Sequence, residues 1–226
     1  MFHFFAIPIT DEWGTTYQLT TAGYTALVLI MLAILLLACF LGNSLSKPHF
    51  SARQLAFSAI AIALAMVTSY IKLFKLPMGG SVTLLSMLFI CLIGYWYGLR
   101  AGLMTAVAYG FLQLISDPYI ISFPQMLVDY IFAFGALGMS GLFSQSKNGL
   151  IKGYLAGVLG RYFFSFLSGM IFFGIYAADY GMSAPVYSLV YNGAYLSAEA
   201  VITIIILCLP PMKRAMVQLK NMAVKG

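Results

Sequence analysis

YTALVLIMLAILLLACFL, residues 24–41, is an apolar stretch without a single charged side chain. A helix of roughly 20 apolar residues is long enough to cross the hydrocarbon core of a bilayer. The stretch is too long for the apolar region of a signal peptide, and neither a basic segment nor a small-residue cleavage site flanks it. It therefore predicts a retained transmembrane helix.

The rest of the chain has the same character, since 62% of its 226 residues are hydrophobic and 8% are charged. An average soluble domain is about 25% charged, so this composition excludes a soluble enzyme or a nucleic-acid-binding domain. Lipid cannot satisfy open backbone polar groups, and no period-two barrel pattern is present, so we expect every spanning element to be helical. The candidate spans lie at about 22–42, 54–72, 82–98, 101–116, 123–144, 153–176 and 186–209.

A weak change of composition at SLSKPHFS, residues 44–51, divides the chain into two parts. We expect a leader with one extra transmembrane helix at 1–50 and a compact six-helix membrane domain at 51–226. With the N-terminus outside, nine of the twelve Lys and Arg residues fall in cytoplasmic segments, and only Lys72 and Lys75 fall in an external loop. The positive-inside rule then predicts a multi-pass protein of the cell membrane with an external N-terminus and a cytoplasmic C-terminus.

No pattern in the sequence indicates a metal, a cofactor or a catalytic centre. The three Cys lie in separate apolar runs, and the two His lie far from any carboxylate cluster. The sequence also lacks a phosphate-binding loop, a Ser/His pair and a His-Glu-x-x-His motif. We therefore predict that the chain is not an enzyme and needs no cofactor.

Three charged residues fall inside predicted spans, where a charge costs roughly 2.5–3.5 kcal/mol on insertion scales. Asp129, in SFPQMLVDYIFAFGALG, is interpreted as a ligand carboxylate for a cationic or amino-bearing small molecule, as a structural partner of Arg161, or as a helix-end residue near water. Arg161 is interpreted as reaching the inner interface, or as pairing with a carboxylate. The role of Glu199 stays open.

Glu199 shares one predicted helix face with Asn192 and Tyr195, because the three are spaced by three and four residues. On the same segment Tyr187, Tyr191 and Tyr195 recur every fourth residue. This stripe is typical either of interfacial packing or of a cavity lining.

Four segments together resemble the thiamine-specific substrate-binding subunit, or S-component, of energy-coupling factor (ECF) transporters. They are LPMGGSVTLLSML at 76–88, GLRAGL at 98–103, VDYIFAFGALGMSGLF at 128–143 and RYFFSFLSGMIFFGIYAADYGMSAPVYSLVYNG at 161–193. The match covers about 51–210. It implies an all-α integral membrane protein, a six-helix S-component bundle preceded here by one extra N-terminal helix.

The resemblance also implies a function. An S-component captures a vitamin from outside and associates with a transmembrane coupling protein and two cytoplasmic ATPase subunits, and toppling of the subunit releases the substrate inside. The implied partners are therefore a small-molecule vitamin, these subunits and the lipid bilayer, and no nucleic acid.

The family motifs place the implied site on particular residues. The acidic-Tyr pair falls on Asp129-Tyr130, with Asp in place of Glu, while the family's His and stacking Trp fall on Ser165 and Phe173. The implied substrate-binding residues are Tyr119, Asp129, Tyr130, Ser165, Phe173, Tyr187 and Asn192. The implied coupling motif is Ala61 and Ala65, with Ala59 and Ala63 in a second register, where small residues allow close helix approach.

The departures from the family pattern leave the ligand open between thiamine and a relative such as hydroxymethylpyrimidine, a thiazole or a pyridoxine-like precursor. Lys72 and Lys75, in KLFKLPMGG, lie in the loop expected to cover the site. Two rival interpretations are an intramembrane enzyme that uses Asp129 and Glu199, and a scaffold whose filled bundle has no polar cavity.

Overall fold

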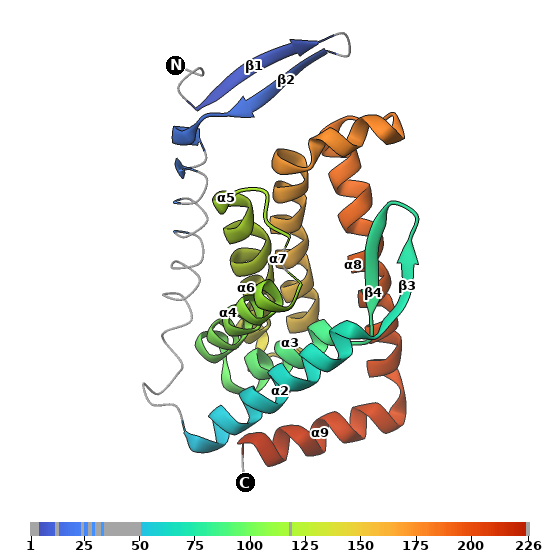
Figure 1. The fold of residues 1–226 in the computed structure, drawn as a ribbon. Helices are drawn as coiled ribbons and strands as arrows, with labels where there is room; N and C mark the ends of the chain where they lie inside the picture. Colours follow the sequence, from blue (N-terminus) through green and yellow to red (C-terminus); the bar gives the residue numbers. More distant parts are fainter. Residues whose placement is uncertain are drawn as a thin grey trace.

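The computed structural model describes residues 5–11, 14–23, 25, 26, 29, 33, 51–117 and 119–224. Most of the helix predicted at 22–42 lies outside these residues, although the positions described within it are helical. The N-terminal part also forms an antiparallel hairpin of β1 (Ala6–Asp11) and β2 (Gly14–Leu19). Figure 1 shows this hairpin and the C-terminus at opposite ends of the molecule.

From residue 51 onward the chain is mostly helical. A helix begins directly after Ser51, whose hydroxyl oxygen accepts a hydrogen bond from the backbone N–H of Gln54 at 3.1 Å, an N-cap that satisfies a free donor of the first turn. The long helices are α2 (Ala52–Tyr70), α3 (Ser86–Tyr97), α4 (Leu99–Ser116), α7 (Gly149–Phe172), α8 (Ala184–Cys208) and α9 (Pro210–Val224). Short helical segments are α5 (Phe123–Met126), η2 (Leu127–Phe132), α6 (Ala133–Gly135), η3 (Ala136–Phe143) and η4 (Gly174–Tyr180).

Five segments of the described chain are long and apolar enough to cross a membrane. They are Ala52–Tyr70, Leu99–Ser116, Phe123–Phe143, Gly149–Phe172 and Ala184–Cys208. Helix α3 is apolar but shorter, and the predicted span at 82–98 is wrong at its start because Thr83 still belongs to a strand.

That strand is part of a second hairpin, formed by β3 (Lys72–Leu76) and β4 (Gly79–Thr83). Pro77 and Met78 make its two-residue turn, and proline favours such a position because its φ is fixed. Gly80 has a φ of 67°, and a Cβ there would lie 2.8 Å from a ring carbon of Tyr195. Glycine thus lets the hairpin lie directly against α8, beside which Figure 1 shows it.

The segment 123–143 is continuous but irregular, and Asp129 and Tyr130 lie in its π-helical turn, η2. A π-helical turn carries an extra residue and widens the helix locally, and such turns are frequent at functional sites. Gly110 of α4 makes room for it, because a Cβ at this position would clash with the backbone carbonyl of Tyr130.

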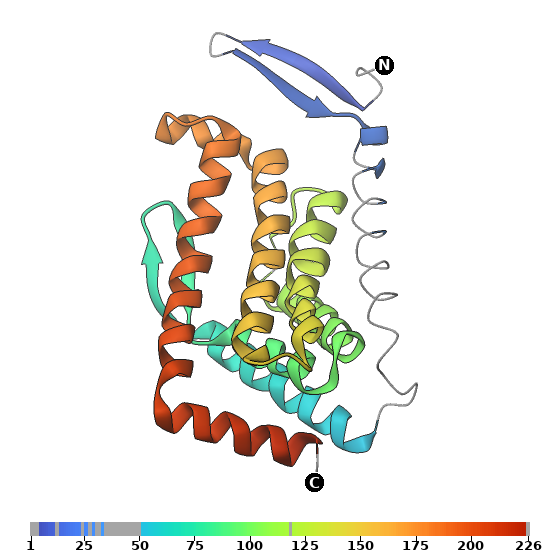
Figure 2. The same cartoon turned by 180° about the vertical axis from the view of Figure 1, so that it is seen from behind.

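The helices enclose a core between α3, α4, η3, α7 and α8. Its fully buried large side chains include Met87, Ile90, Tyr109, Leu137 and Tyr154. Figures 1 and 2 show that α2 and α9 lie at the end of the bundle that carries the C-terminus. Segment η4 and helix α5, with which the irregular segment 123–143 begins, lie toward the other end. The core therefore fills the C-terminal end of the bundle and leaves the site described next between the other ends of the helices.

Candidate substrate-binding site

A cavity of about 620 Å³ lies between the β3–β4 hairpin, α4, η2, α7 and α8. Pockets for small ligands usually measure about 300–1,000 Å³. The scaffold interpretation predicted a filled bundle, and the cavity contradicts it. All the predicted substrate-binding residues line it, namely Tyr119, Asp129, Tyr130, Ser165, Phe173, Tyr187 and Asn192.

Asp129 is held in the cavity by Gln125, one helical turn earlier. The Gln125 side-chain amide donates to the Asp129 carboxylate at 2.6 Å and to the Tyr119 carbonyl at 3.0 Å, and its oxygen accepts from the Ile121 N–H at 3.0 Å. Gln125 is only 1% exposed, so these bonds fix the orientation of the carboxylate. Sequence reasoning missed Gln125, although its spacing of four residues from Asp129 places both on one helix face.

Aromatic side chains form a wall beside Asp129. Tyr119 stacks on Phe173 with ring centroids 5.9 Å apart and an interplanar angle of 25°, and Phe173 stacks on Tyr176 at 6.4 Å. The Tyr119 and Tyr176 hydroxyls are hydrogen-bonded at 3.1 Å. Tyr130 fixes the loop before α5, because its hydroxyl accepts from the Tyr119 N–H at 2.8 Å and donates to the Asp117 carbonyl at 2.9 Å.

Asn192 and the tyrosine stripe of α8 form the facing wall. The Asn192 amide donates to the carbonyls of Ser165 and Ser188 at 3.1 and 3.0 Å, and its oxygen accepts from the Tyr195 hydroxyl at 3.0 Å. Tyr187, Tyr191 and Tyr195 all line the cavity. Of the two interpretations of the stripe, the cavity lining is therefore the right one.

Glu199 closes one end of the cavity and has a structural role. Its carboxylate accepts hydrogen bonds from the Thr83 N–H and hydroxyl at 3.3 and 2.6 Å, and from the Ser86 hydroxyl and the Met87 N–H, both at 3.2 Å. Glu199 is 4% exposed. It joins α8 to the end of β4 and to the first turn of α3, where a helix N-terminus favours a negative charge.

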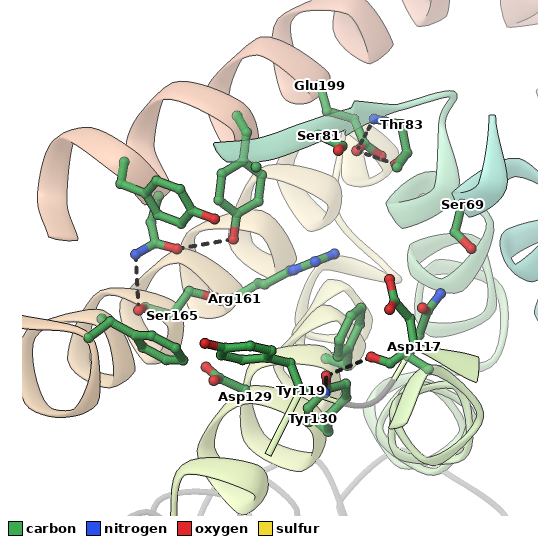
Figure 3. A pocket seen from close by; sticks show the side chains of 18 of the residues that line it. Ser69, Ser81, Thr83, Asp117, Tyr119, Asp129, Tyr130, Arg161, Ser165 and Glu199 are labelled. Atoms are coloured by element: carbon green, nitrogen blue, oxygen red, sulfur yellow. Dashed lines mark hydrogen bonds between the residues drawn. The ribbon is translucent and has the colours of Figure 1, made fainter. Parts of the chain in front are cut away.

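Arg161 also lines the cavity, which the sequence interpretation did not foresee. Its guanidinium carbon lies 4.2 Å from the centroid of the Phe134 ring. Figure 3 shows the side chain extending across the cavity, away from Asp129. Within the described part of the chain the two residues form no ion pair within 4.0 Å, so the alternative interpretation of Asp129 as a direct ion-pair partner of Arg161 is not supported. The signal in the sequence was the spacing of four residues between Arg161 and Ser165, which places both on one face of α7.

The alanines of α2 divide into two faces. Ala61 and Ala65 are 6% and 0% exposed because they pack into the interior beside α3 and α4. Ala59 and Ala63 are exposed. Of the two registers, Ala59 and Ala63 face outward, whereas Ala61 and Ala65, on which the implied coupling motif falls, are buried.

A bundle of apolar helices around a ligand-sized cavity lined by carboxylates and aromatic rings defines a membrane protein that binds a small molecule. Residues 55–219 match the family model described as thiamine transporter protein (Thia_YuaJ). The chain belongs to this family.

Individual relatives agree with this assignment. The chain is 35% identical to the thiamine transporter ThiT of Bacillus subtilis over 167 residues, which are 67% of this chain and 86% of the relative. It is 28% identical to ThiT of Lacticaseibacillus paracasei over 124 residues, 49% of this chain and 59% of that protein. The solved structure of ThiT from Listeria monocytogenes superposes with a TM-score of 0.58 at 28% identity, covering 70% of this chain and 94% of the other.

These comparisons confirm the resemblance on which the sequence interpretation rested. The fold is that of an all-helical membrane S-component, and the chain is a multi-pass membrane protein. Its relatives are transporters, so it is not an enzyme and the interpretation as an intramembrane enzyme is wrong.

Proposed function

We propose that this chain is the substrate-binding subunit of an ECF-type uptake transporter and that it captures thiamine from outside the cell. The observation that carries the proposal is the Asp129 carboxylate, oriented by Gln125 at 2.6 Å within an aromatic-lined cavity of about 620 Å³. A carboxylate in a site of this kind attracts a cationic or amino-bearing ring.

The cavity matches the chemistry of thiamine. Its thiazolium ring is cationic, its pyrimidine ring carries an amino group, and both rings are flat. The faces of Tyr119 and Phe173 provide stacking surfaces that also attract a ring cation. Asp129 provides the negative charge, and the Asn192 oxygen retains a second lone pair for a ring amino group.

Ser165 and Phe173 stand where the family pattern has a His and a stacking Trp, so the contacts that this pattern provides for the thiamine rings are reduced. This supports a second candidate ligand class, the thiamine precursors and pyridoxine-like rings. The binding of thiamine, hydroxymethylpyrimidine and the thiazole alcohol to one purified sample distinguishes these ligands.

The transport step requires partners that this chain does not contain. We propose a transmembrane coupling protein and two cytoplasmic ATPase subunits, with the exposed Ala59/Ala63 face of α2 as the contact. The positive-inside distribution supports an external N-terminus and a cytoplasmic C-terminus. The opposite placement of the N-terminal hairpin and the C-terminus is compatible with that orientation (Figure 2).

The test is calorimetric titration of the purified full-length protein without ATP. We expect tight binding of thiamine, and a loss of about 10- to 150-fold in Asp129→Asn, because a charge-assisted contact is worth about 1.5–3 kcal/mol. Asp179→Asn is the matched control, since Asp179 is exposed on η4 and does not line the cavity. Absence of binding for all three ligands, or equal affinities of Asp129→Asn and the wild type, would contradict the proposal.

A further inference from the structure

Helix α9 turns away from α8 and lies across the C-terminal end of the bundle, as Figures 1 and 2 show. The turn falls at Pro210, and Leu209 before it is extended, with φ −64° and ψ 135°, because proline disfavours a helical residue in front of it. With 15 residues, α9 is not among the described segments that are long and apolar enough to span a membrane. Since α8 is a spanning segment, α9 lies near one surface of the bilayer.

One face of α9 is fixed to the bundle, where the helix contacts α2 and α3. Met216 packs against the core, and Ala223 is buried. The Ala223 carbonyl accepts a hydrogen bond from the Tyr97 hydroxyl at 2.9 Å. The ammonium nitrogen of Lys220 lies 4.1 Å from the centroid of the Tyr95 ring, a distance at which a cation and a ring face attract each other. These contacts at the end of α3 fix the direction of the opposite face of α9.

That opposite face combines apolar and cationic side chains. Val217, Met222 and Val224 are 62%, 61% and 48% exposed. Lys213 and Arg214 are also exposed, and their spacing of four and three residues from Val217 places them next to it on the helix surface. A helix that joins exposed apolar residues to Lys and Arg is typical of helices that lie in the membrane interface, with the apolar side chains at the boundary of the acyl chains.

Further cations surround α9 at this end of the bundle. Arg53 is exposed in the first turn of α2, and Lys152 is exposed in the first turn of α7. The start of α7 lies close to α9, because a Cβ at Gly149 would be 3.0 Å from a ring carbon of Tyr95, the ring that Lys220 contacts. The sequences of α2, α3, α7 and α9 contain no Asp or Glu. The charge of this surface is therefore not neutralised by these helices.

We propose that α9 is an interfacial helix whose outward face binds the phosphate groups of anionic phospholipids in the adjacent leaflet. Val217 and Met222 then contact the upper part of the acyl chains, while Lys213 and Arg214 bind headgroup phosphates, to which a guanidinium can donate two hydrogen bonds. An anionic headgroup is preferred to phosphatidylcholine, because the latter carries its own cation beside the phosphate. This surface is separate from the cavity, so the inference is independent of the ligand that the cavity takes.

The experiment places a fluorescent reporter on this face. Met222→Cys, in a full-length chain whose three native Cys are replaced by Ser, is labelled with an environment-sensitive maleimide dye and reconstituted into phosphatidylcholine vesicles. A small share of the lipid is brominated phosphatidylglycerol or brominated phosphatidylcholine, and bromine quenches a dye that it approaches. We expect the emission of an apolar environment. We also expect a preference for the anionic lipid of about 25-fold, because each of two cations near an anionic surface contributes about fivefold.

Two pairs of substitutions make the result specific. In Lys213→Gln combined with Arg214→Gln, the preference for phosphatidylglycerol should fall to about one. The matched control is Lys72→Gln combined with Lys75→Gln, which removes two exposed charges from β3 and should keep the preference. Salt at about 1 M, where the Debye length is about 3 Å, should lower the preference of the unsubstituted face.

Three results would overturn the inference. Emission typical of water would show that the outward face of α9 does not touch the bilayer. Equal quenching by the two brominated lipids would show an embedded face without selectivity for anionic headgroups. An equal loss of preference in the β3 control and in the α9 variant would assign the effect to net charge rather than to α9. Thiamine binding is measured separately, so its absence would contradict the proposed function and leave the lipid contact standing.

Discussion

At the residue scale, the site depends on polar groups that hold other polar groups in place. Gln125 and Glu199 are both buried. Gln125 connects η2 to the preceding loop, whereas Glu199 connects α8 to β4 and α3, which are distant along the chain. Asp129 faces the cavity, whereas Glu199 is saturated by hydrogen bonds from β4 and α3. Two acids of the same membrane domain therefore have different roles, set by their partners.

Gln125→Met tests whether the orientation of Asp129 matters for binding. The variant removes the 2.6 Å hydrogen bond and the two bonds to the loop that carries Tyr119. We expect thiamine affinity to fall about tenfold, equivalent to about 1.4 kcal/mol, the scale of one hydrogen bond. Calorimetric titration measures the change, and Gln218→Met, an exposed position on α9, should leave it at the wild-type value.

Glu199→Gln tests the structural role of the second acid. The new amide nitrogen would face the donors of Thr83 or of Ser86 and Met87, so two donors would meet without an acceptor. We expect a loss of stability of about 1–3 kcal/mol and a lower Tm in detergent. Ligand affinity measured below the Tm should change much less. A large loss of affinity at an unchanged Tm would show instead that Glu199 contacts the ligand.

At the element scale, the sequence predicted the long helices well and the irregular segments poorly. Apolar length alone identifies α4, α7 and α8, because a spanning helix needs only a continuous apolar run. The β3–β4 hairpin was predicted as a loop, and its two ends were assigned to the neighbouring helical spans. Its first strand, Lys72–Leu76, has only three apolar residues and two lysines, which is too short a pattern to indicate a strand. The π-helical turn at Leu127–Phe132 has no composition signal of its own. It depends on a tertiary contact, the approach of α4 at Gly110.

The site shows the same division between motif and geometry. The motif residues Asp129, Tyr130 and Asn192 were found because their spacing matches a family pattern, and they do line the cavity. Gln125 and Arg161 were missed as cavity groups, since their roles depend on where neighbouring helices place them. Periodicity gives the face of a helix but not what that face meets.

The two alanine registers of α2 give a prediction at this scale. Replacing Ala59 and Ala63 together by Leu should leave ligand affinity unchanged, because both side chains point out of the bundle, and should abolish uptake in cells that carry the coupling module. Ala65→Leu is the contrasting variant, because Ala65 is fully buried beside Tyr109 and Met87. Overpacking there costs about 1–3 kcal/mol, so binding and expression should both decline. Normal uptake by the double variant would exclude this face as the contact.

At the scale of the whole molecule, the bundle separates a packed end from a hollow end. The core residues of α3, η3 and α7 fill the end near α2 and α9, while the cavity lies toward η4 and the loop before α5. If the chain works as the proposed uptake subunit, the packed core between the cavity and α2 and α9 obstructs a direct path through the bundle. Release on the other side of the membrane would then require movement of the subunit rather than a channel through it.

This argument makes the orientation of the chain testable. Lys75 on β3 and Lys213 on α9 are both exposed and lie in elements at different levels of the bundle. In a background with every native Cys replaced by Ser, we expect Lys75→Cys to react with a membrane-impermeant maleimide in intact cells. Lys213→Cys should react only in inverted vesicles, because α9 carries a cluster of basic residues that the positive-inside rule keeps in the cytoplasm. Reaction of Lys213→Cys from outside would reverse the topology, turn the cavity toward the cytoplasm, and thereby contradict capture of an external vitamin.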